Sequence, residues 1–140
     1  MTIAKGTFLD PNEIRVLSER RDRIEACARA AYETSRAYCL TIGDDTQKSW
    51  EAAEQCQRDA AMRGIRTVLD GATPEESHEA WCRDKISDGW KYGSVKDSAK
   101  KEHPCLVSYV QFPEVQKRKD AIYITVICAM AKALDLKVCR

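Results

Sequence analysis

The stretch Trp90–Tyr109, with the sequence WKYGSVKDSAKKEHPCLVSY, limits the folds that are open to this chain. It has neither helical nor strand periodicity, although segments with helical patterns come before and after it. A loop of this length inside a compact domain is usually functional or disordered. Disorder is disfavoured because its aromatic and aliphatic side chains are costly to leave in water. We therefore expect an ordered loop, at about 90–109, that presents an aromatic ring and several cations on a helical support.

Length and charge narrow the classes of protein to which the chain can belong. Its 140 residues suit a single domain, residues 1–140, with one core. The 23 Lys and Arg residues almost balance the 22 Asp and Glu residues, so no global field attracts DNA, RNA or a membrane surface. No apolar run approaches the ~20 residues of a membrane span, and the first residues lack the apolar core of a signal peptide. We expect a cytoplasmic protein without a membrane or nucleic-acid partner.

The cysteines and histidines give little support to catalysis or metal binding. The seven cysteines are an odd number without a Cys-x-x-Cys pair, which is typical of reduced, buried thiols rather than of a disulfide scaffold. His78 and Cys82 are four residues apart, but no further ligands for a structural zinc are suitably spaced. Pro104 separates Cys105 from His103, and no orienting acid is evident for a thiolate nucleophile. We expect no metal, no cofactor and no enzymatic activity.

The first of four segments with helical apolar spacing begins at Asp10. Asp10 and Glu13 can form a capping box around Pro11, and the helix is expected to run to about Leu40. The stretch Ser18–Arg23 is too charged to bury, so the first turns are expected to project from the domain. One face of the helix carries an apolar stripe, formed by Ile14, Leu17, Ile24, Ala28 and Ala31.

The remaining pattern completes a mainly α fold. Ser49 can cap a helix that begins at Trp50, a capping box opens another at Thr73, and Gly89 is expected to end that one in the left-handed conformation. These helices are expected at about 50–70, 73–88 and 113–136. We expect a small four-helix domain with a long ordered loop, in which a short strand is allowed at Cys105–Tyr109. The helices of residues 11–70 are expected to pack on the rest.

The second half of the chain carries a spaced motif. From His78 it reads HExW, seven residues, GWxYG, and later HPCLVxY. This pattern resembles the RyR domain, which occurs in tandem pairs in ryanodine receptors and as single copies in bacteria and phages; the motif covers about residues 75–135. Ser94 and Ser108 stand where the family often has proline, and Lys96 stands where arginine is frequent, which removes a fork-shaped donor. The match rests on His78, Glu79, Trp81, Gly89, Trp90, Tyr92, Gly93, Val95, Asp97, Lys100, His103, Pro104, Cys105, Leu106, Val107, Tyr109, Pro113 and Glu114.

Trp90 is the first candidate for a ligand contact. A tryptophan alone is more often part of a core than a stacking platform. The resemblance changes this balance, because in the receptor repeats the Gly-Trp pair is implicated in adenine nucleotide binding. We therefore expect a base to stack on Trp90, with a second aromatic from Tyr92, from Trp50 or from a neighbouring subunit, and we assign Trp81 to the core.

Four cations follow Trp90 within the loop: Lys96, Lys100, Lys101 and His103. Clustered cations beside an aromatic platform suit a base with phosphates or ribose attached. The alternative is a solvated lysine face, partly neutralised by neighbouring acids. The resemblance points to the Lys96 position as a phosphate contact.

A second group of candidates surrounds the turn at Gly43. Arg36, Tyr38 and Trp50 lie near it in the sequence, and phage members of the family look similar here. They could form a wall of the same ligand site. The alternative is helix packing for Tyr38 and Trp50 and solvent exposure for Arg36.

These observations favour a non-catalytic module that binds an adenine nucleotide or a nucleotide-derived signal, such as an ADP-ribose derivative or a cyclic nucleotide. A free-standing copy could sequester its ligand, and in a phage protein acting in the host cytoplasm that ligand could be a host immune signal. The alternative is a protein–protein interaction module without a small-molecule ligand. Since the receptor repeats come in pairs, a single copy could form a homodimer with the first helix as its seam.

Overall fold

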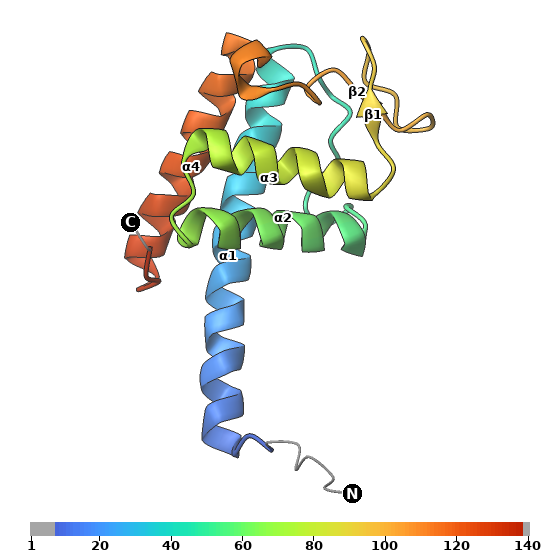
Figure 1. Ribbon diagram of the computed structural model, residues 1–140. Helices are drawn as coiled ribbons and strands as arrows, with labels where there is room; N and C mark the ends of the chain where they lie inside the picture. Colours follow the sequence, from blue (N-terminus) through green and yellow to red (C-terminus); the bar gives the residue numbers. More distant parts are fainter. Residues whose placement is uncertain (1–7, 139–140) are drawn as a thin grey trace, which may run out of the picture.

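The computed structural model describes residues 8–138, and its helices form a mainly α domain, as predicted (Figure 1). None of the described helices has the length and apolar character that a bilayer crossing requires. In chain order the elements are α1 (Pro11–Thr41), α2 (Gln55–Leu69), α3 (Pro74–Ser87), β1 (Lys91–Tyr92), β2 (Glu102–His103), the 3₁₀ helix η1 (Tyr109–Gln111) and α4 (Glu114–Ala133).

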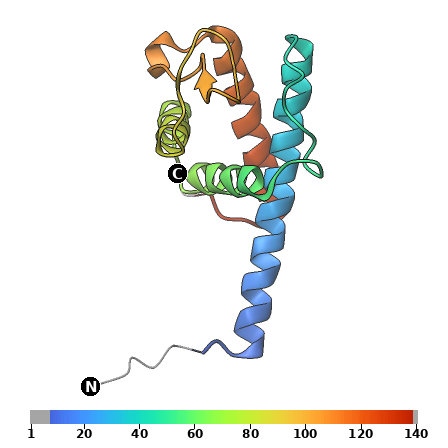
Figure 2. The same cartoon turned by 90° about the vertical axis from the view of Figure 1, so that its right-hand side faces the viewer.

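The core lies where the second half of α1 runs alongside α4 in the opposite direction, with α2 packed against both (Figures 1 and 2). Small residues at this contact, Ala28 and Ala31 of α1 and Ala131 of α4, let the helices approach closely. The α3 helix packs on α2 and carries the loop that contains both strands. The largest fully buried side chains are Ile24, Ile65, Ile127, Val68 and Cys27.

The N-terminal part of α1 projects from this body, as its charge predicted. The capping box is present, because the Asp10 carboxylate accepts from the Glu13 N–H at 2.9 Å and the Glu13 carboxylate accepts from the Asp10 N–H at 2.8 Å. Residues 8–22 are exposed, and Ile24 is the first buried residue of the helix. Both views show this part of α1 extending away from the other helices (Figures 1 and 2).

The expected start of the second helix was wrong by five residues. The helix begins at Gln55, not at Trp50. Ser49 accepts from the backbone N–H groups of Ala52 and Ala53 and so closes a separate turn. The helix is opened instead by Glu54 and Gln57, which form a capping box.

The loop contains short strands, but not at Cys105–Tyr109. β1 and β2 pair in parallel, with Lys91 opposite Glu102 and Tyr92 opposite His103. Residues 104–108 cannot extend β2, since Pro104 has no N–H to donate and the Leu106 N–H turns back to the His103 carbonyl at 3.4 Å. The chain then forms η1 and enters α4.

Candidate functional site

The end of α3 fixes the position of Trp90. Gly89 has a φ of +88°, as predicted, and the backbone closes in a Schellman motif. The Trp90 N–H donates to the Lys85 carbonyl at 2.9 Å and the Gly89 N–H donates to the Ile86 carbonyl at 3.0 Å. The half-buried Trp90 ring lies 4.5 Å from the Lys85 ammonium group. A cation therefore lies over one face of the ring.

Close packing between the strands brings His103 to the same place. A Cβ atom on Gly93 would lie 2.6 Å from the Cβ of Glu102, so only glycine allows the strands to approach this closely. The His103 ring centre is 6.2 Å from that of Trp90 and 5.0 Å from that of Trp81. The rings of two tryptophans thus lie near one histidine ring.

His103 is held in its neutral form. Its Nδ1 accepts from the Cys105 N–H at 3.1 Å, so the proton of the neutral ring resides on Nε2. The pKa of His103 is lowered to about 4, first of all by burial. Three ammonium groups contribute to this shift, those of Lys96, Lys85 and Lys119. Near neutral pH the ring is therefore an uncharged hydrogen-bond donor, and the charges of three lysines help to keep it neutral.

We call Lys85, Lys96, Lys119 and His103 the cationic cluster. Its members come from three separate parts of the chain, namely α3, the loop and α4. Burial lowers the pKa of Lys85, and the charge of Lys96 lowers it further. Such like-charge crowding is found at many anion sites, where the bound ligand relieves it.

The turn after α1 supplies the counter-charge. The Lys96 ammonium donates to the Thr46 hydroxyl at 2.8 Å and lies 3.7 Å from the Asp44 carboxylate. Burial opposes ionisation of Asp44, but hydrogen bonds from Thr46 and the Lys96 charge lower its pKa overall. The Asp44 charge also raises the pKa of His103, so this carboxylate partly offsets the effect of the lysines there.

The other loop candidates have different positions. Tyr92 is exposed, and its register opposite His103 places both on the same side of the two-stranded sheet. Lys100 is exposed at the tight turn around Asp97. Lys101 donates to the Asp88 carbonyl at 2.7 Å, so it caps the C-terminus of α3.

The three N-terminal candidates lie outside the cationic cluster. Trp50 is 4% exposed and packs in the core with its ring centre 5.3 Å from that of Tyr32, which leaves no surface for a ligand. Arg36 pairs with Glu33 at 2.9 Å, and the Tyr38 hydroxyl donates to the Val115 carbonyl at 3.2 Å. The suggestion that Trp50 forms a wall of the site is therefore wrong, whereas the neighbouring Gly43 turn does reach the site through Asp44 and Thr46.

Sequence reasoning missed Lys85, Lys119 and Trp81. Lys85 lies five residues before Trp90, and a Schellman motif brings those two positions together, so the Gly89 signal could have identified it. Trp81 lies outside the buried core cluster and is half-buried against His103. Lys119 is far away in sequence and has no local signal.

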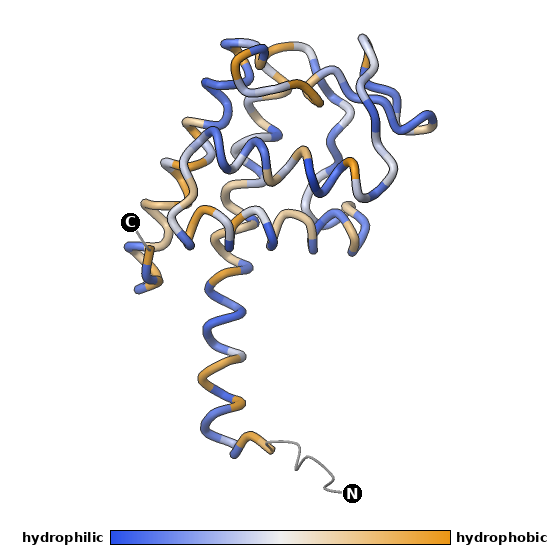
Figure 3. Tube along the Cα trace, viewed as in Figure 1, coloured by the Kyte–Doolittle hydropathy of each residue, from blue (hydrophilic) through white to orange (hydrophobic). Residues whose placement is uncertain are grey.

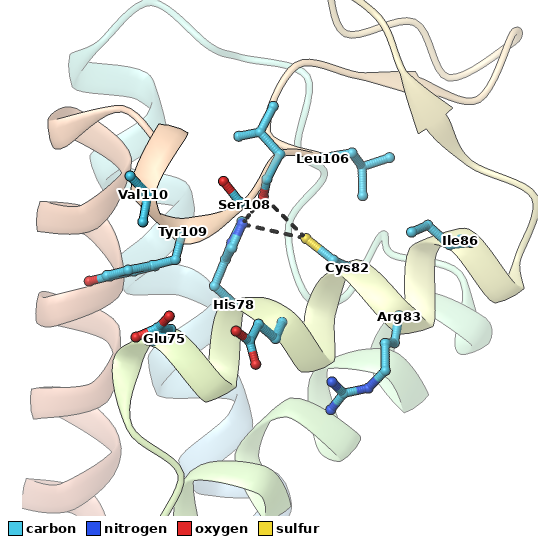
Figure 4. A pocket seen from close by; sticks show the side chains of 11 residues that line it. Glu75, His78, Cys82, Arg83, Ile86, Leu106, Ser108, Tyr109 and Val110 are labelled. Atoms are coloured by element: carbon cyan, nitrogen blue, oxygen red, sulfur yellow. Dashed lines mark hydrogen bonds between the residues drawn. The ribbon is translucent and has the colours of Figure 1, made fainter.

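A hollow lies between α3 and residues 106–110 (Figure 4). Its volume is about 430 Å³. His78 lies inside it and its Nε2 is 2.8 Å from the Val107 carbonyl, which pins the chain to α3. Burial raises the pKa of the adjacent Cys82 thiol, so this sulfur is not an activated nucleophile. Glu75, Glu79 and Arg83 line the hollow, so its charged lining is of mixed sign.

The comparison with protein families agrees with the motif. The model of the RyR domain matches residues 51–139, which is more than half of the chain. The match includes α2, α3, the loop and α4, and therefore the whole cationic cluster. The chain belongs to the RyR domain family.

Proposed function

We propose that this domain binds an adenine nucleotide or a nucleotide-derived signal, such as an ADP-ribose derivative or a cyclic nucleotide, at the cationic cluster. The observation that carries this proposal is the position of the neutral His103, whose ring centre lies 5.0 Å from that of Trp81 and 6.2 Å from that of Trp90, and whose pKa is lowered by burial and by the charges of three lysines. The arrangement combines what phosphates need with what a flat base needs.

The phosphates would be held by the lysines. Each of the three ammonium groups lowers the pKa of His103, and Lys85 and Lys96 also repel one another. An anion bound between the lysines would form charge-assisted hydrogen bonds with them. Its negative charge would also reduce the repulsion between their ammonium groups, so both effects would favour binding. His103 would add an Nε2–H donor without adding a charge.

The base would stack on Trp90. Lys85 lies over one face of this ring, and the base would use the other face, for a contribution of ~1–3 kcal/mol. Tyr92 is 59% exposed on the same loop and could close over the base from the other side. Lys101 has no role in this proposed binding mode, since its ammonium donates to the Asp88 carbonyl at the end of α3.

The proposed action is sequestration without turnover. Burial raises the pKa of Cys105, the thiol nearest to His103 in the chain, which makes it a poor nucleophile. A small module with this site can lower the free concentration of a signal simply by binding it. If a phage encodes the protein, the signal would be an immune nucleotide in the host cytoplasm, which rests on the family resemblance alone.

A thermal-shift screen tests the proposal. The purified protein is melted with adenine nucleotides, ADP-ribose, its cyclic isomers, and cyclic di- and trinucleotides. A ligand at ~100 times its dissociation constant stabilises the folded state by ~2.7 kcal/mol, which a melting scan resolves. The shift is expected to disappear in Trp90→Ala and to shrink in Lys96→Met. The matched control Lys100→Met removes an exposed charge from the same loop and is expected to keep the full shift.

Two results would overturn the proposal. If no nucleotide stabilises the well-folded protein, the nucleotide-binding function is excluded. This result would favour the alternative, a protein–protein interaction module. Chromatography of the ligand after long incubation provides the second test, since conversion of the nucleotide to a product would contradict sequestration.

A further inference from the structure

The projecting part of α1, residues 8–23, carries apolar side chains that nothing in the described chain covers. Ile14 is 55% exposed and Leu17 is 53% exposed. Figure 3 shows hydrophobic positions on this part of the helix, between hydrophilic ones. Exposed single residues are ordinary, but these two continue the stripe that packs in the core further along the same helix, at Ile24 and Ala28.

The stripe follows the spacing of a helix–helix seam. Positions 10, 14, 17, 21 and 24 alternate by four and three residues, which is the a and d pattern of paired helices. In the projecting part the seam consists of Asp10, Ile14, Leu17 and Arg21. Its flanking positions, 13 and 20, hold Glu13 and Arg20. An acidic half of the seam therefore precedes a basic half.

This distribution of charge is complementary to itself only when two copies run in opposite directions. With Ile14 packed on Leu17 of a second copy, Asp10 faces the second copy's Arg21. In the same register Glu13 lies near the second copy's Arg20. A parallel pair would instead place Asp10 on Asp10 and Arg21 on Arg21, which like-charge repulsion disfavours.

The same register fits the shape of the molecule. It places residue 8 of one copy opposite residue 23 of the other, so the projecting segment 8–23 is matched along its whole length. At ~1.5 Å per helical residue the overlap is roughly 20 Å long. In this antiparallel register the two helical bodies lie at opposite ends of the pair, because each body continues from the C-terminal end of its own projecting segment.

We propose that two copies of this chain form a two-fold antiparallel dimer through residues 8–23 of α1. The seam is short, below the length of a standard interface, so the dimer is weak and depends on protein concentration. The proposal is independent of ligand binding, because none of these residues lies in the cationic cluster.

Sedimentation velocity over a range of protein concentrations tests the dimer. The wild-type protein is expected to shift from monomer to dimer as the concentration rises, whereas Leu17→Asp is expected to remain monomeric throughout. Val16→Asp is the matched control, because Val16 is 54% exposed on the same turn but lies off the seam. Its dimer is expected to persist. A monomeric wild type at every concentration, or an equal loss in both variants, would overturn the proposal.

Charge reversal tests the direction of the pair. Arg21→Glu places a carboxylate against Asp10 of the second copy and is expected to weaken the dimer at least tenfold. Arg15→Glu reverses a charge on the opposite face, where Arg15 pairs with Glu19 at 3.2 Å, and is expected to have little effect. In a parallel pair, residue 21 would face itself and one like-charge pair would replace another. An unchanged dimer in Arg21→Glu would therefore contradict the antiparallel arrangement.

Discussion

Lys85, which we propose as a phosphate contact, is subject to opposing electrostatic effects. Its ammonium lies 4.5 Å from the centre of the Trp90 ring, yet burial and the charge of Lys96 lower its pKa. The cation–π contact contributes only ~0.5–1 kcal/mol at such sites. The desolvation and repulsion work against this contact. A residue of this kind is expected to matter more for the ligand than for the fold.

The prediction for Lys85→Met follows from this balance. Methionine keeps the apolar stem against Trp90 and removes the buried charge, so the free energy of unfolding should fall by no more than ~0.5 kcal/mol. The stabilisation by a nucleotide found in the screen should shrink, because one phosphate contact is lost. Chemical unfolding with and without the nucleotide measures both quantities. A large loss of stability in the absence of ligand would show instead that Lys85 supports the fold.

The three tryptophans show what the sequence could say about single residues. Gly89 predicted that the helix ends just before Trp90, because a glycine in the left-handed conformation ends a helix and changes the direction of the chain. Trp81 was assigned to the core because it lies on the helical stripe, but the stripe faces the loop at this point and its ring lies beside His103. Trp50 was offered as a site residue, yet it lies in the core with Tyr32. The spacing of apolar residues predicts which face of a helix is packed, but it does not predict which segment packs against that face.

At the scale of elements, local chemistry predicted most helix ends. The capping boxes at Asp10 and Thr73 are both present, because such ends are closed by side chains only three residues apart. The start of α2 was misplaced because Ser49 closes a turn that resembles a cap. The strand pairing could not be predicted, since it joins Tyr92 to His103 across an intervening turn and depends on the absence of a side chain at Gly93.

The junction between α3 and the loop gives a prediction at this scale. Lys101 donates to the Asp88 carbonyl at 2.7 Å, whereas Lys100 next to it is exposed. Lys101→Met should lower the free energy of unfolding by ~0.5–1 kcal/mol, because a cation is lost at the C-terminus of a helix. Lys100→Met loses the same charge and should change it by less than ~0.5 kcal/mol. Equal effects in urea unfolding would contradict a capping role for Lys101.

For the whole molecule, the sequence predicted the helical body and the projecting end of α1, because both depend on hydrophobic and charged patterning along one helix. The candidate site was only partly predictable. Its lysines come from α3, the loop and α4, and its counter-charge Asp44 comes from the turn after α1. Such a cluster exists only after the helices have packed, and Lys119 in particular has no signal in its own segment.

The most direct test of the cationic cluster is a pH titration of His103 by nuclear magnetic resonance of its ring nitrogens. The chain has two histidines, so His103→Gln identifies the signal. In the free protein we expect a pKa of about 4, because burial and the charges of Lys96, Lys85 and Lys119 disfavour the protonated ring. Saturation with the nucleotide found in the screen should raise this pKa, since phosphate charge offsets the lysines and favours the protonated ring. A pKa near the ordinary value of 6.5 that the nucleotide leaves unchanged would contradict both the cluster and its proposed function.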